Sequence, residues 1–307
     1  MARLLLILIE AALTTGFCGS GALWSSPHNT AVAIPCAPPL TPTKLKLITR
    51  VLSTSTFPVT LLADGPAFAA RANASSGTRA GAGLGALVSL ARANSRGTHL
   101  HHQVKPLSYP QLERRFGAKV RKFTGYNQRR PSKLGFFAWC AASAYEHCWH
   151  LEDDTAVSDL GAVAAEYEGA ADLVARGHDR KPFWWNVQLR VKAPGGADFS
   201  RFIGDPAHGL PEGTFNFVNL ALCRVSRRFA RAVLQAIDTE LNTSHHEIYI
   251  PYVFSRARRC LTHTQLTPDH ASHILFNSHS THRHLMTLRG FQRKAVEGTL
   301  MVAHPVK

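Results

Sequence analysis

The 307-residue chain lacks several patterns that define common protein classes. No uninterrupted apolar run reaches about 18 residues, which excludes a polytopic membrane protein. Six cysteines without a CxxC pair exclude a disulfide-dense miniature scaffold and argue against a structural zinc knuckle. No G-x-S-x-G segment supports serine-hydrolase catalysis. An apolar fraction of 45% nevertheless predicts a folded core.

Acidic residues are scarce and unevenly placed, with 20 Asp and Glu against 35 Lys and Arg and a net charge of +15. From Arg71 to Lys133 there are thirteen Lys or Arg and a single acid, Glu113. From Glu146 to Asp172 there are eight acids and no Lys or Arg. A basic surface beside an acidic centre suits a site for a cation and a polyanionic ligand. The alternatives are a solvated basic face beside an acidic helix, or nucleic-acid binding.

The N-terminal segment has the pattern of a targeting signal. Arg3, a short apolar run and small residues up to Ala22 are typical of a signal peptide or short signal-anchor over residues 1–22. Glu10 is a costly carboxylate within the apolar run of such a signal. An organellar transit peptide is the alternative, because Glu10 is the only acid before Asp64. Prolines then indicate a linker over residues 23–43, and we expect one domain over residues 44–307. Residues 69–97, rich in Ala, Gly, Arg and Ser, are expected to form a low-complexity insertion.

The remaining chain alternates between strand-like and helix-like patterns. Apolar runs predict strands over residues 44–51, 59–62, 99–107, 148–151, 171–174 and 215–224. Helical spacing of apolar residues predicts helices over residues 132–146, 159–167 and 226–241, the last capped by Ser226. This alternation indicates an α/β fold with a single mixed sheet flanked by helices.

Three acids directly follow the apolar strand predicted at residues 148–151. Ligands of open α/β sheets bind beyond the carboxyl ends of the strands. Glu152 and Asp154 are two residues apart and project to the same side of extended backbone, whereas Asp153 points away. Two hard oxygen ligands on one side suit Mg²⁺ or Mn²⁺. The alternative is an acidic helix N-terminus, where the helix dipole favours carboxylates.

The stretch Tyr145-Glu-His-Cys-Trp-His-Leu-Glu-Asp-Asp154 resembles the signature of GT-A-type glycosyltransferases, in which a strand delivers a D-x-D-like motif to a metal and a nucleotide-sugar diphosphate. Other segments resemble the family in the same order along the chain. They are residues 59–64, residues 172–174, Arg224-Val-Ser-Arg-Arg-Phe229, Ser244-His-His-Glu-Ile-Tyr-Ile-Pro251 and His304-Pro-Val-Lys307. Here an E-x-D form replaces D-x-D. The resemblance implies a Rossmann-like GT-A domain.

The resemblance also implies roles for individual residues. Asp154, Glu152 and His304 would be the metal ligands, with Glu152 or Asp153 orienting the donor ribose. Asp64 would meet the nucleoside. Arg129 and Lys307 would meet the diphosphate, where cations stabilise the departing nucleotide.

Glu247 matches the acid that deprotonates the acceptor hydroxyl in inverting members of the family. The alternative is structural, because Ser244-x-x-Glu247 is also a capping-box pattern.

The expected function is therefore a transferase that uses Mn²⁺ or Mg²⁺ and moves a sugar from a UDP- or GDP-linked donor to a glycan, protein or lipid acceptor, with inversion. The expected location is the lumen of the secretory pathway or outside the cell, with membrane association through the N-terminus. No nucleic-acid partner is expected. The alternatives are a non-catalytic basic module that binds acidic glycans or nucleic acid, and an inactive transferase-like protein.

Overall fold

The computed structural model describes twelve stretches of the chain. They are residues 29–37, 39–64, 79–96, 100–107, 109–116, 132–169, 171–178, 217–239, 246–257, 260–274, 286–298 and 301–306. Residues 1–22, which the sequence predicts to be a targeting signal, lie outside them. In the part of the chain that these stretches cover, no helix is both long and apolar enough to cross a bilayer.

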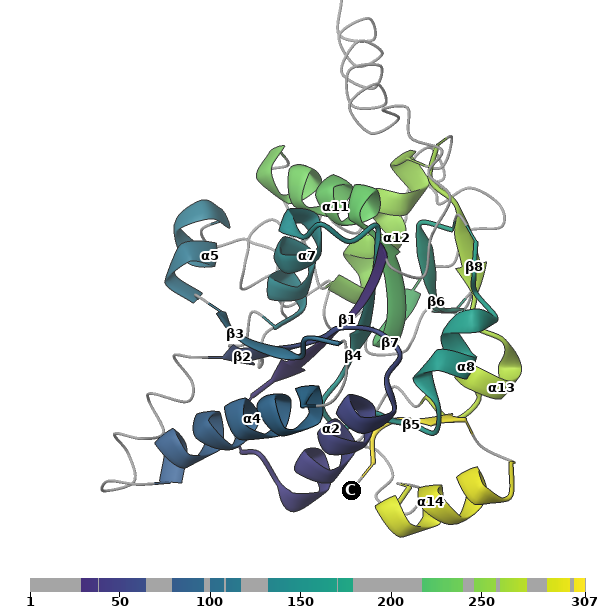
Figure 1. Cartoon of the computed structure of the whole chain (residues 1–307). Helices are drawn as coiled ribbons and strands as arrows, with labels where there is room; N and C mark the ends of the chain where they lie inside the picture. Colours follow the sequence, from purple (N-terminus) through teal and green to yellow (C-terminus); the bar gives the residue numbers. More distant parts are fainter. Residues whose placement is uncertain are drawn as a thin grey trace, which may run out of the picture.

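Strands and helices alternate along the described residues (Figure 1). The strands are β1 (Thr30–Cys36), β2 (Val59–Asp64), β3 (Gln103–Leu107), β4 (His147–Leu151), β5 (Ala156–Val157), β6 (Leu173–His178), β7 (Phe217–Ser226), β8 (His263–Gln265) and β9 (Val302–Ala303). The helices are α2 (Pro42–Thr54), α4 (Arg79–Ser95), α5 (Tyr109–Phe116), α7 (Ser132–Ala142), α8 (Leu160–Ala165), α11 (Arg227–Thr239), α12 (His246–Ala257), α13 (Pro268–Ala271) and α14 (Leu288–Val296).

Within the described residues, the main sheet has seven strands in the order β3-β2-β1-β4-β7-β6-β8. Strand β7 runs antiparallel to both of its neighbours, and the other strand pairs are parallel. The expected α/β fold class with a mixed sheet flanked by helices is confirmed. The chain crosses from one side of β1 to the other between β3 and β4, so the carboxyl ends of β1 and β4 flank a topological switch point, where open sheets bind ligands.

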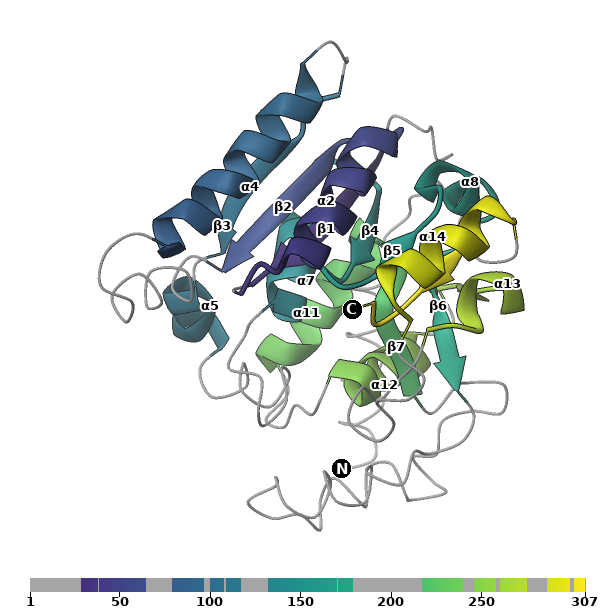
Figure 2. The same ribbon diagram turned by 90° about the horizontal axis from the view of Figure 1, so that it is seen from below.

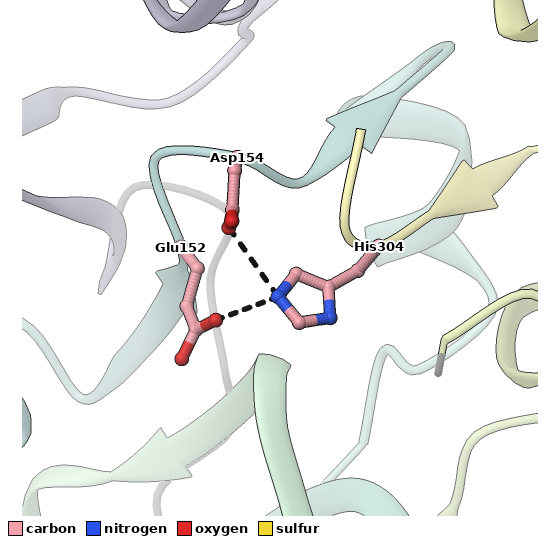
Figure 3. Close-up of side chains that lie close together, drawn as sticks. All are labelled: Glu152, Asp154 and His304. Carbon is pink, nitrogen blue, oxygen red and sulfur yellow. Dashed lines mark ion pairs between the residues drawn. The ribbon is translucent and has the colours of Figure 1, made fainter. Parts of the chain in front are cut away.

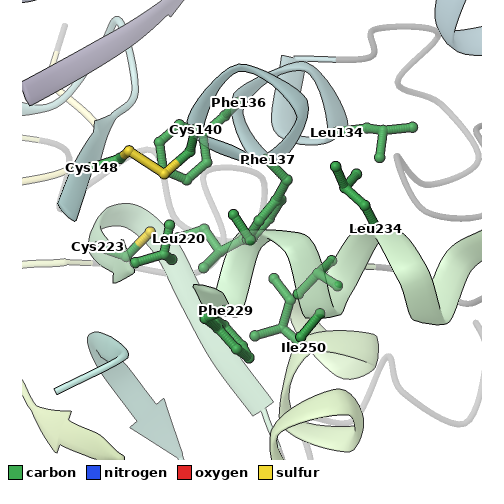
Figure 4. Packing of buried hydrophobic residues seen from close by; sticks show 14 of the residues in the cluster. Leu134, Phe136, Phe137, Cys140, Cys148, Leu220, Cys223, Phe229, Leu234 and Ile250 are labelled. Atoms are coloured by element: carbon green, nitrogen blue, oxygen red, sulfur yellow. A yellow bond between two sulfur atoms is a disulfide. The ribbon is translucent and has the colours of Figure 1, made fainter. Parts of the chain in front are cut away.

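Helices cover both faces of the sheet (Figures 1 and 2). Alternate residues of a strand point to opposite faces, so in β1 Ala33 faces one apolar cluster and Ile34 the other. The first cluster lies under α5, α7, α11 and α12 (Figure 4), and the second under α2, α4 and α8. The apolar stripe predicted for α11 is confirmed, since Phe229, Val233 and Ile237 are fully buried. Ser226 caps this helix as expected, its hydroxyl accepting the Phe229 N–H at 3.0 Å.

The Pro-rich linker expected over residues 23–43 is wrong for residues 30–36 and for residues 42 and 43, which begin α2. Residues 30–36 form the buried strand β1 in the interior of the sheet, so the folded domain begins before residue 44. Pro42 stands in the first turn of α2, where a missing backbone N–H costs no helix hydrogen bond. The apolar residues 31–34 therefore determine that this segment is a strand, despite the prolines that surround it.

The strand expected over residues 44–51 is also wrong, because these residues belong to α2. Thr41 caps the helix by accepting the Lys44 N–H at 3.2 Å. Four apolar residues of α2 are buried at a helical spacing: Ile48, Val51 and Leu52 in the second apolar cluster, and Leu47 in a smaller cluster with Phe291.

The low-complexity insertion expected over residues 69–97 contains the helix α4, which buries Leu87 and Ala91 one turn apart. The expected insertion is therefore wrong for residues 79–95, because the alanines and leucines of this segment favour helix more than its glycines oppose it. The other predicted strands and helices are present with shifted ends.

Candidate metal centre

The acidic turn follows β4 at the switch point of the sheet. The ladder between β4 and β7 ends where the Glu152 N–H donates to the carbonyl of Ala221 at 2.9 Å. The chain then turns, and the Thr155 N–H donates to the carbonyl of Glu152 at 3.0 Å. These two backbone bonds place residues 152–154 beyond the carboxyl end of a buried strand, as the sequence predicts.

Glu152, Asp154 and His304 converge at this turn (Figure 3). The Nε2 atom of His304 lies 2.7 Å from Oε2 of Glu152 and 3.3 Å from Oδ1 of Asp154. One potential ligand atom from each side chain lies within 4.8 Å of the others. Among the described residues, this is the group of acidic, histidine and cysteine side chains whose spacing suits a metal ion. We refer to these three residues as the Glu-Asp-His cluster.

A short second sheet positions His304 in this cluster. Strand β9 pairs antiparallel with β5, which directly follows the acidic turn, in the register Ala156–Ala303 and Val157–Val302. The His304 N–H then donates to the carbonyl of His273 at 3.1 Å. Ala156, Ala303 and Val306 pack in a small apolar cluster with Phe291 of α14.

Asp153 does not belong to the cluster. Its Oδ1 lies 2.7 Å from Nζ of Lys44, and its Oδ2 accepts the Ala37 N–H at 3.4 Å. Burial raises the pKa of Asp153, and Lys44 opposes that rise. Asp153 therefore ties the acidic turn to the end of β1 and the start of α2.

Lys133, in the first turn of α7, also contacts the cluster. Its Nζ forms an ion pair with Oε1 of Glu152, and the lysine side chain is 7% exposed. In the sequence, Lys133 is the last member of the basic run, and no site role is predicted for it. Its place at the start of the helix that leads into β4 is the signal that could have indicated such a role.

The charges of the cluster shift one another's ionisation. Burial alone would raise the pKa of Glu152, but Lys133 and then His304 hold it well below its ordinary value. Burial alone would lower the pKa of His304, but the carboxylates of Glu152 and Asp154 raise it to about 10. Without a metal, the imidazolium of His304 therefore supplies a positive charge to the two acids.

Glu247 lies in the first turn of α12 and is partly buried. Burial raises its pKa to about 8, with Lys133 and His304 opposing the rise and Glu152 adding to it. These electrostatic interactions place Glu247 near the Glu-Asp-His cluster. Ser244, the partner in the alternative capping box, lies outside the described residues.

The remaining predicted site residues are Asp64, Arg129 and Lys307. Asp64 ends β2 opposite Leu107 of β3, and because β2 is parallel to β1, its end lies at the same edge of the sheet as the end of β1. Arg129 and Lys307 lie outside the described residues.

The donor set fits a divalent cation. Two carboxylates offer the hard oxygens that Mg²⁺ and Mn²⁺ prefer, and Mn²⁺ also accepts an imidazole nitrogen. The backbone holds all three side chains in place, and two of the three carry negative charge that a cation neutralises.

Solved structures that are similar to this chain are glycosyltransferases, the class of protein that the sequence resembles. The bifunctional glycosyltransferase WbbM is 11% identical with a TM-score of 0.48, and the match covers 92% of this chain and 47% of WbbM. Mouse xyloside xylosyltransferase 1 is 12% identical with a TM-score of 0.43, covering 90% of this chain and 97% of that one. The galactosyltransferase LgtC, in complex with donor and acceptor sugar analogues, is 8% identical with a TM-score of 0.46, covering 89% of this chain and 86% of that one.

This chain thus spans less than half the length of WbbM. No family model matches the chain, and no curated protein matches it by sequence. Similarities of this size concern the fold and do not define a substrate.

Proposed function

We propose that this chain is a metal-dependent glycosyltransferase that moves a sugar from a nucleotide-diphosphate donor to an acceptor hydroxyl. The convergence of Glu152, Asp154 and His304 beyond the carboxyl end of β4 carries the proposal. The three side chains come from two segments that lie far apart in the sequence, one in the middle of the domain and one near its C-terminus. Backbone pairing of β5 with β9, rather than side-chain attraction alone, brings them together.

In this proposal, Asp154, Glu152 and His304 hold Mn²⁺ or Mg²⁺. A bound cation of this kind supplies Lewis-acid stabilisation of the negative charge on the departing nucleotide diphosphate. Asp64, Arg129 and Lys307 are proposed to contact the donor. The carboxylate of Asp153 is engaged by Lys44. Asp153 is therefore proposed to influence the donor ribose indirectly, by fixing the position of the acidic turn.

Glu247 is the proposed general base. It lies close enough to Glu152 and His304 for their charges to shift its pKa, and it leads a helix that packs against β7. The ionised carboxylate would take the proton from the acceptor hydroxyl as the new glycosidic bond forms. Attack assisted by such a base from the face opposite the leaving group would invert the sugar carbon.

The proposed location is the secretory pathway. The disulfide between Cys140 and Cys148 supports an oxidising compartment, since structural disulfides are rare in the cytosol. The proposed acceptor is a glycan, protein or lipid, and the donor carries UDP or GDP.

The test is the binding of UDP and GDP to the full chain, titrated with Mn²⁺ and with a chelator, followed by a screen of nucleotide-sugar hydrolysis under both conditions. The proposal predicts that Mn²⁺ strengthens nucleotide binding and that hydrolysis depends on it. Binding of polyanions with a steep salt dependence, together with no nucleotide binding under either condition, would instead favour a non-catalytic basic module, which the net charge of +15 allows.

A further inference from the structure

The two carboxylate oxygens of Glu152 have different partners. Oε2 faces Nε2 of His304 at 2.7 Å, within the Glu-Asp-His cluster. Oε1 is held by the ammonium group of Lys133. Figure 3 shows one oxygen of Glu152 directed at His304 and the other directed away from it. A cation that replaces the imidazolium proton between Glu152 and His304 therefore meets Oε2, while Oε1 is already engaged.

The position of Lys133 is fixed by the packing of α7. Leu134, Phe136 and Phe137, which directly surround Gly135, are buried in the cluster of Figure 4. A Cβ atom at Gly135 would lie 2.7 Å from a methyl carbon of Leu107, so the glycine allows the first turn of α7 to lie close against β3. The lysine side chain is 7% exposed, against 30% for Glu152. The packing of α7 against the core thus fixes the position of Lys133, and its side chain is largely shielded from solvent.

We infer that Lys133 sets the cation preference of the site by keeping Glu152 a one-oxygen ligand. This inference rests on the metal site of the proposed function. Ca²⁺ takes about six to eight oxygen ligands and uses carboxylates with both oxygens, whereas Mg²⁺ takes fewer ligands and keeps several for water and phosphate. With Oε1 bound to Lys133, Glu152 offers one oxygen to the site, beside the carboxylate of Asp154 and the imidazole nitrogen of His304. That set disfavours Ca²⁺ and leaves open positions for the diphosphate of a donor.

Lys133 also adds a positive charge beside the cation, which weakens the binding of every divalent metal. This electrostatic effect acts equally on ions of the same charge. The ratio of the Ca²⁺ and Mn²⁺ dissociation constants therefore isolates the effect of the engaged oxygen from the effect of charge and from a general structural role. Lys133 is thus a positioning residue that acts through Glu152.

The experiment measures Mn²⁺ binding to the full chain by electron paramagnetic resonance, with Ca²⁺ as the competitor. For the unaltered chain we expect Ca²⁺ to bind at least about tenfold more weakly than Mn²⁺. In Lys133→Met, Oε1 is free to join Oε2, and we expect the preference for Mn²⁺ over Ca²⁺ to fall by about tenfold, the lower end of the effect of removing a residue that orients a metal ligand.

The matched control is Lys44→Met, which removes the equivalent ion pair from Asp153, outside the cluster, and should leave the Mn²⁺ preference unchanged. Circular dichroism checks that each variant is folded. An unchanged preference in a folded Lys133→Met variant overturns the inference while the metal site stands. If Lys133→Met does not fold, equal binding of Ca²⁺ and Mn²⁺ by the unaltered chain still overturns it. If the unaltered chain binds neither ion, the proposed function fails and the inference fails with it.

Discussion

The backbone N–H of Val306 donates a hydrogen bond to the carbonyl oxygen of Asp154, with 2.9 Å between nitrogen and oxygen. Together with the pairing of β5 and β9, this bond holds the last described residues of the chain against the acidic turn. The side chain of Asp154 takes no part in it. The geometry of the Glu-Asp-His cluster is therefore built by backbone contacts, and side chains of the cluster can be altered without removing the contacts that assemble it.

Replacing Asp154 by Asn should greatly weaken metal binding while leaving the fold intact. The amide keeps the shape of the side chain but loses the negative charge that a divalent cation requires. We expect Mn²⁺ affinity to fall by roughly a hundredfold or more, since even residues that orient metal ligands contribute about 10- to 100-fold. Isothermal titration calorimetry with Mn²⁺, and with UDP or GDP in its presence, measures the change.

The control for this variant is Asp153→Asn, which changes the neighbouring acid that pairs with Lys44 instead of His304. It should retain Mn²⁺ binding. Nucleotide binding that still responds to Mn²⁺ in Asp154→Asn would show that the cluster is not the metal site.

Binding of Mn²⁺ should release a proton from His304. The pKa of about 10 means that the imidazole is protonated at neutral pH, whereas a metal ligand must be neutral. Mn²⁺ affinity should therefore rise about tenfold per pH unit below pH 10, because one proton is displaced. Calorimetry in buffers of different ionisation enthalpy should report about one proton released per ion. Heats that do not depend on the buffer would contradict the assignment of His304 as a ligand.

Without metal, the same shift stabilises the fold at low pH. The folded pKa of about 10 lies above the ordinary value of 6.5, so the stabilising contribution is fully present below about pH 6.5 and is lost as the pH rises through 10. His304→Gln removes it. The difference in melting temperature between the metal-free parent and this variant should therefore shrink between pH 6.5 and pH 10.

Replacing Asp172 by Ala should strongly destabilise the domain. Asp172 is 2% exposed, and its carboxylate accepts hydrogen bonds from Ser226 at 2.6 Å, Arg228 at 2.6 Å and the Thr262 N–H at 3.0 Å. It thus joins β6, the start of α11 and the segment before β8. Removing the carboxylate leaves the buried Ser226 hydroxyl without this acceptor and the Arg228 side chain, which is 36% exposed, without its ion pair. Each such loss costs about 1–3 kcal/mol, which urea unfolding would measure.

The control is Asp238→Ala, which breaks a surface pair with Arg115 whose side chains are 36% and 55% exposed. Its loss should cost no more than about 1 kcal/mol. Equal destabilisation by the two variants would contradict the central place of Asp172.

The sequence predicts those helices and strands whose apolar pattern is long or is accompanied by a capping residue or an acidic turn. Strand β4, the helix α11 and the acids after Trp149 fall in this group, since each follows from local periodicity or capping. Strand β1 and helix α4 were missed for a different reason. Prolines and glycines indicate loops locally, but burial against the sheet outweighs that tendency, and burial depends on residues far away in the sequence.

In the candidate site too, some features follow from local sequence and others depend on contacts between distant segments. Glu152 and Asp154 are two residues apart, so the sequence predicts that they face the same side, but in the structure a turn rather than extended backbone brings them together. The approach of His304 was expected through the family resemblance, whereas its physical cause, the pairing of β9 with β5, is a contact between two-residue strands that no local pattern indicates. Local sequence does not predict the role of Lys133, because that role depends on the packing of α7, which brings the Lys133 ammonium group into an ion pair with Glu152.

The last prediction concerns Glu247 as the base. A base must be ionised, and the pKa of about 8 leaves most of the Glu247 carboxyl protonated at pH 7. We therefore expect kcat/KM to rise with pH to a plateau at or below about pH 8, since a cation in the neighbouring cluster favours the ionised form. Glu247→Gln should lower kcat by about 100- to 10,000-fold, the usual contribution of a general base, and should remove this rise.

Glu247→Gln should lower activity but raise stability at high pH. This combination distinguishes a general base from a structural helix cap. The folded pKa of Glu247 lies above its ordinary value of 4.5, so the folded state loses stability as the pH rises from about 4.5 through 8. Glu247→Gln does not ionise, and its melting temperature relative to the parent should increase over that interval. The exposed Glu168→Gln should change neither activity nor melting temperature. If Glu247 were only a cap, its carboxylate would stabilise the helix, and Glu247→Gln would lower the melting temperature at pH 8 while the pH profile of kcat/KM stayed the same.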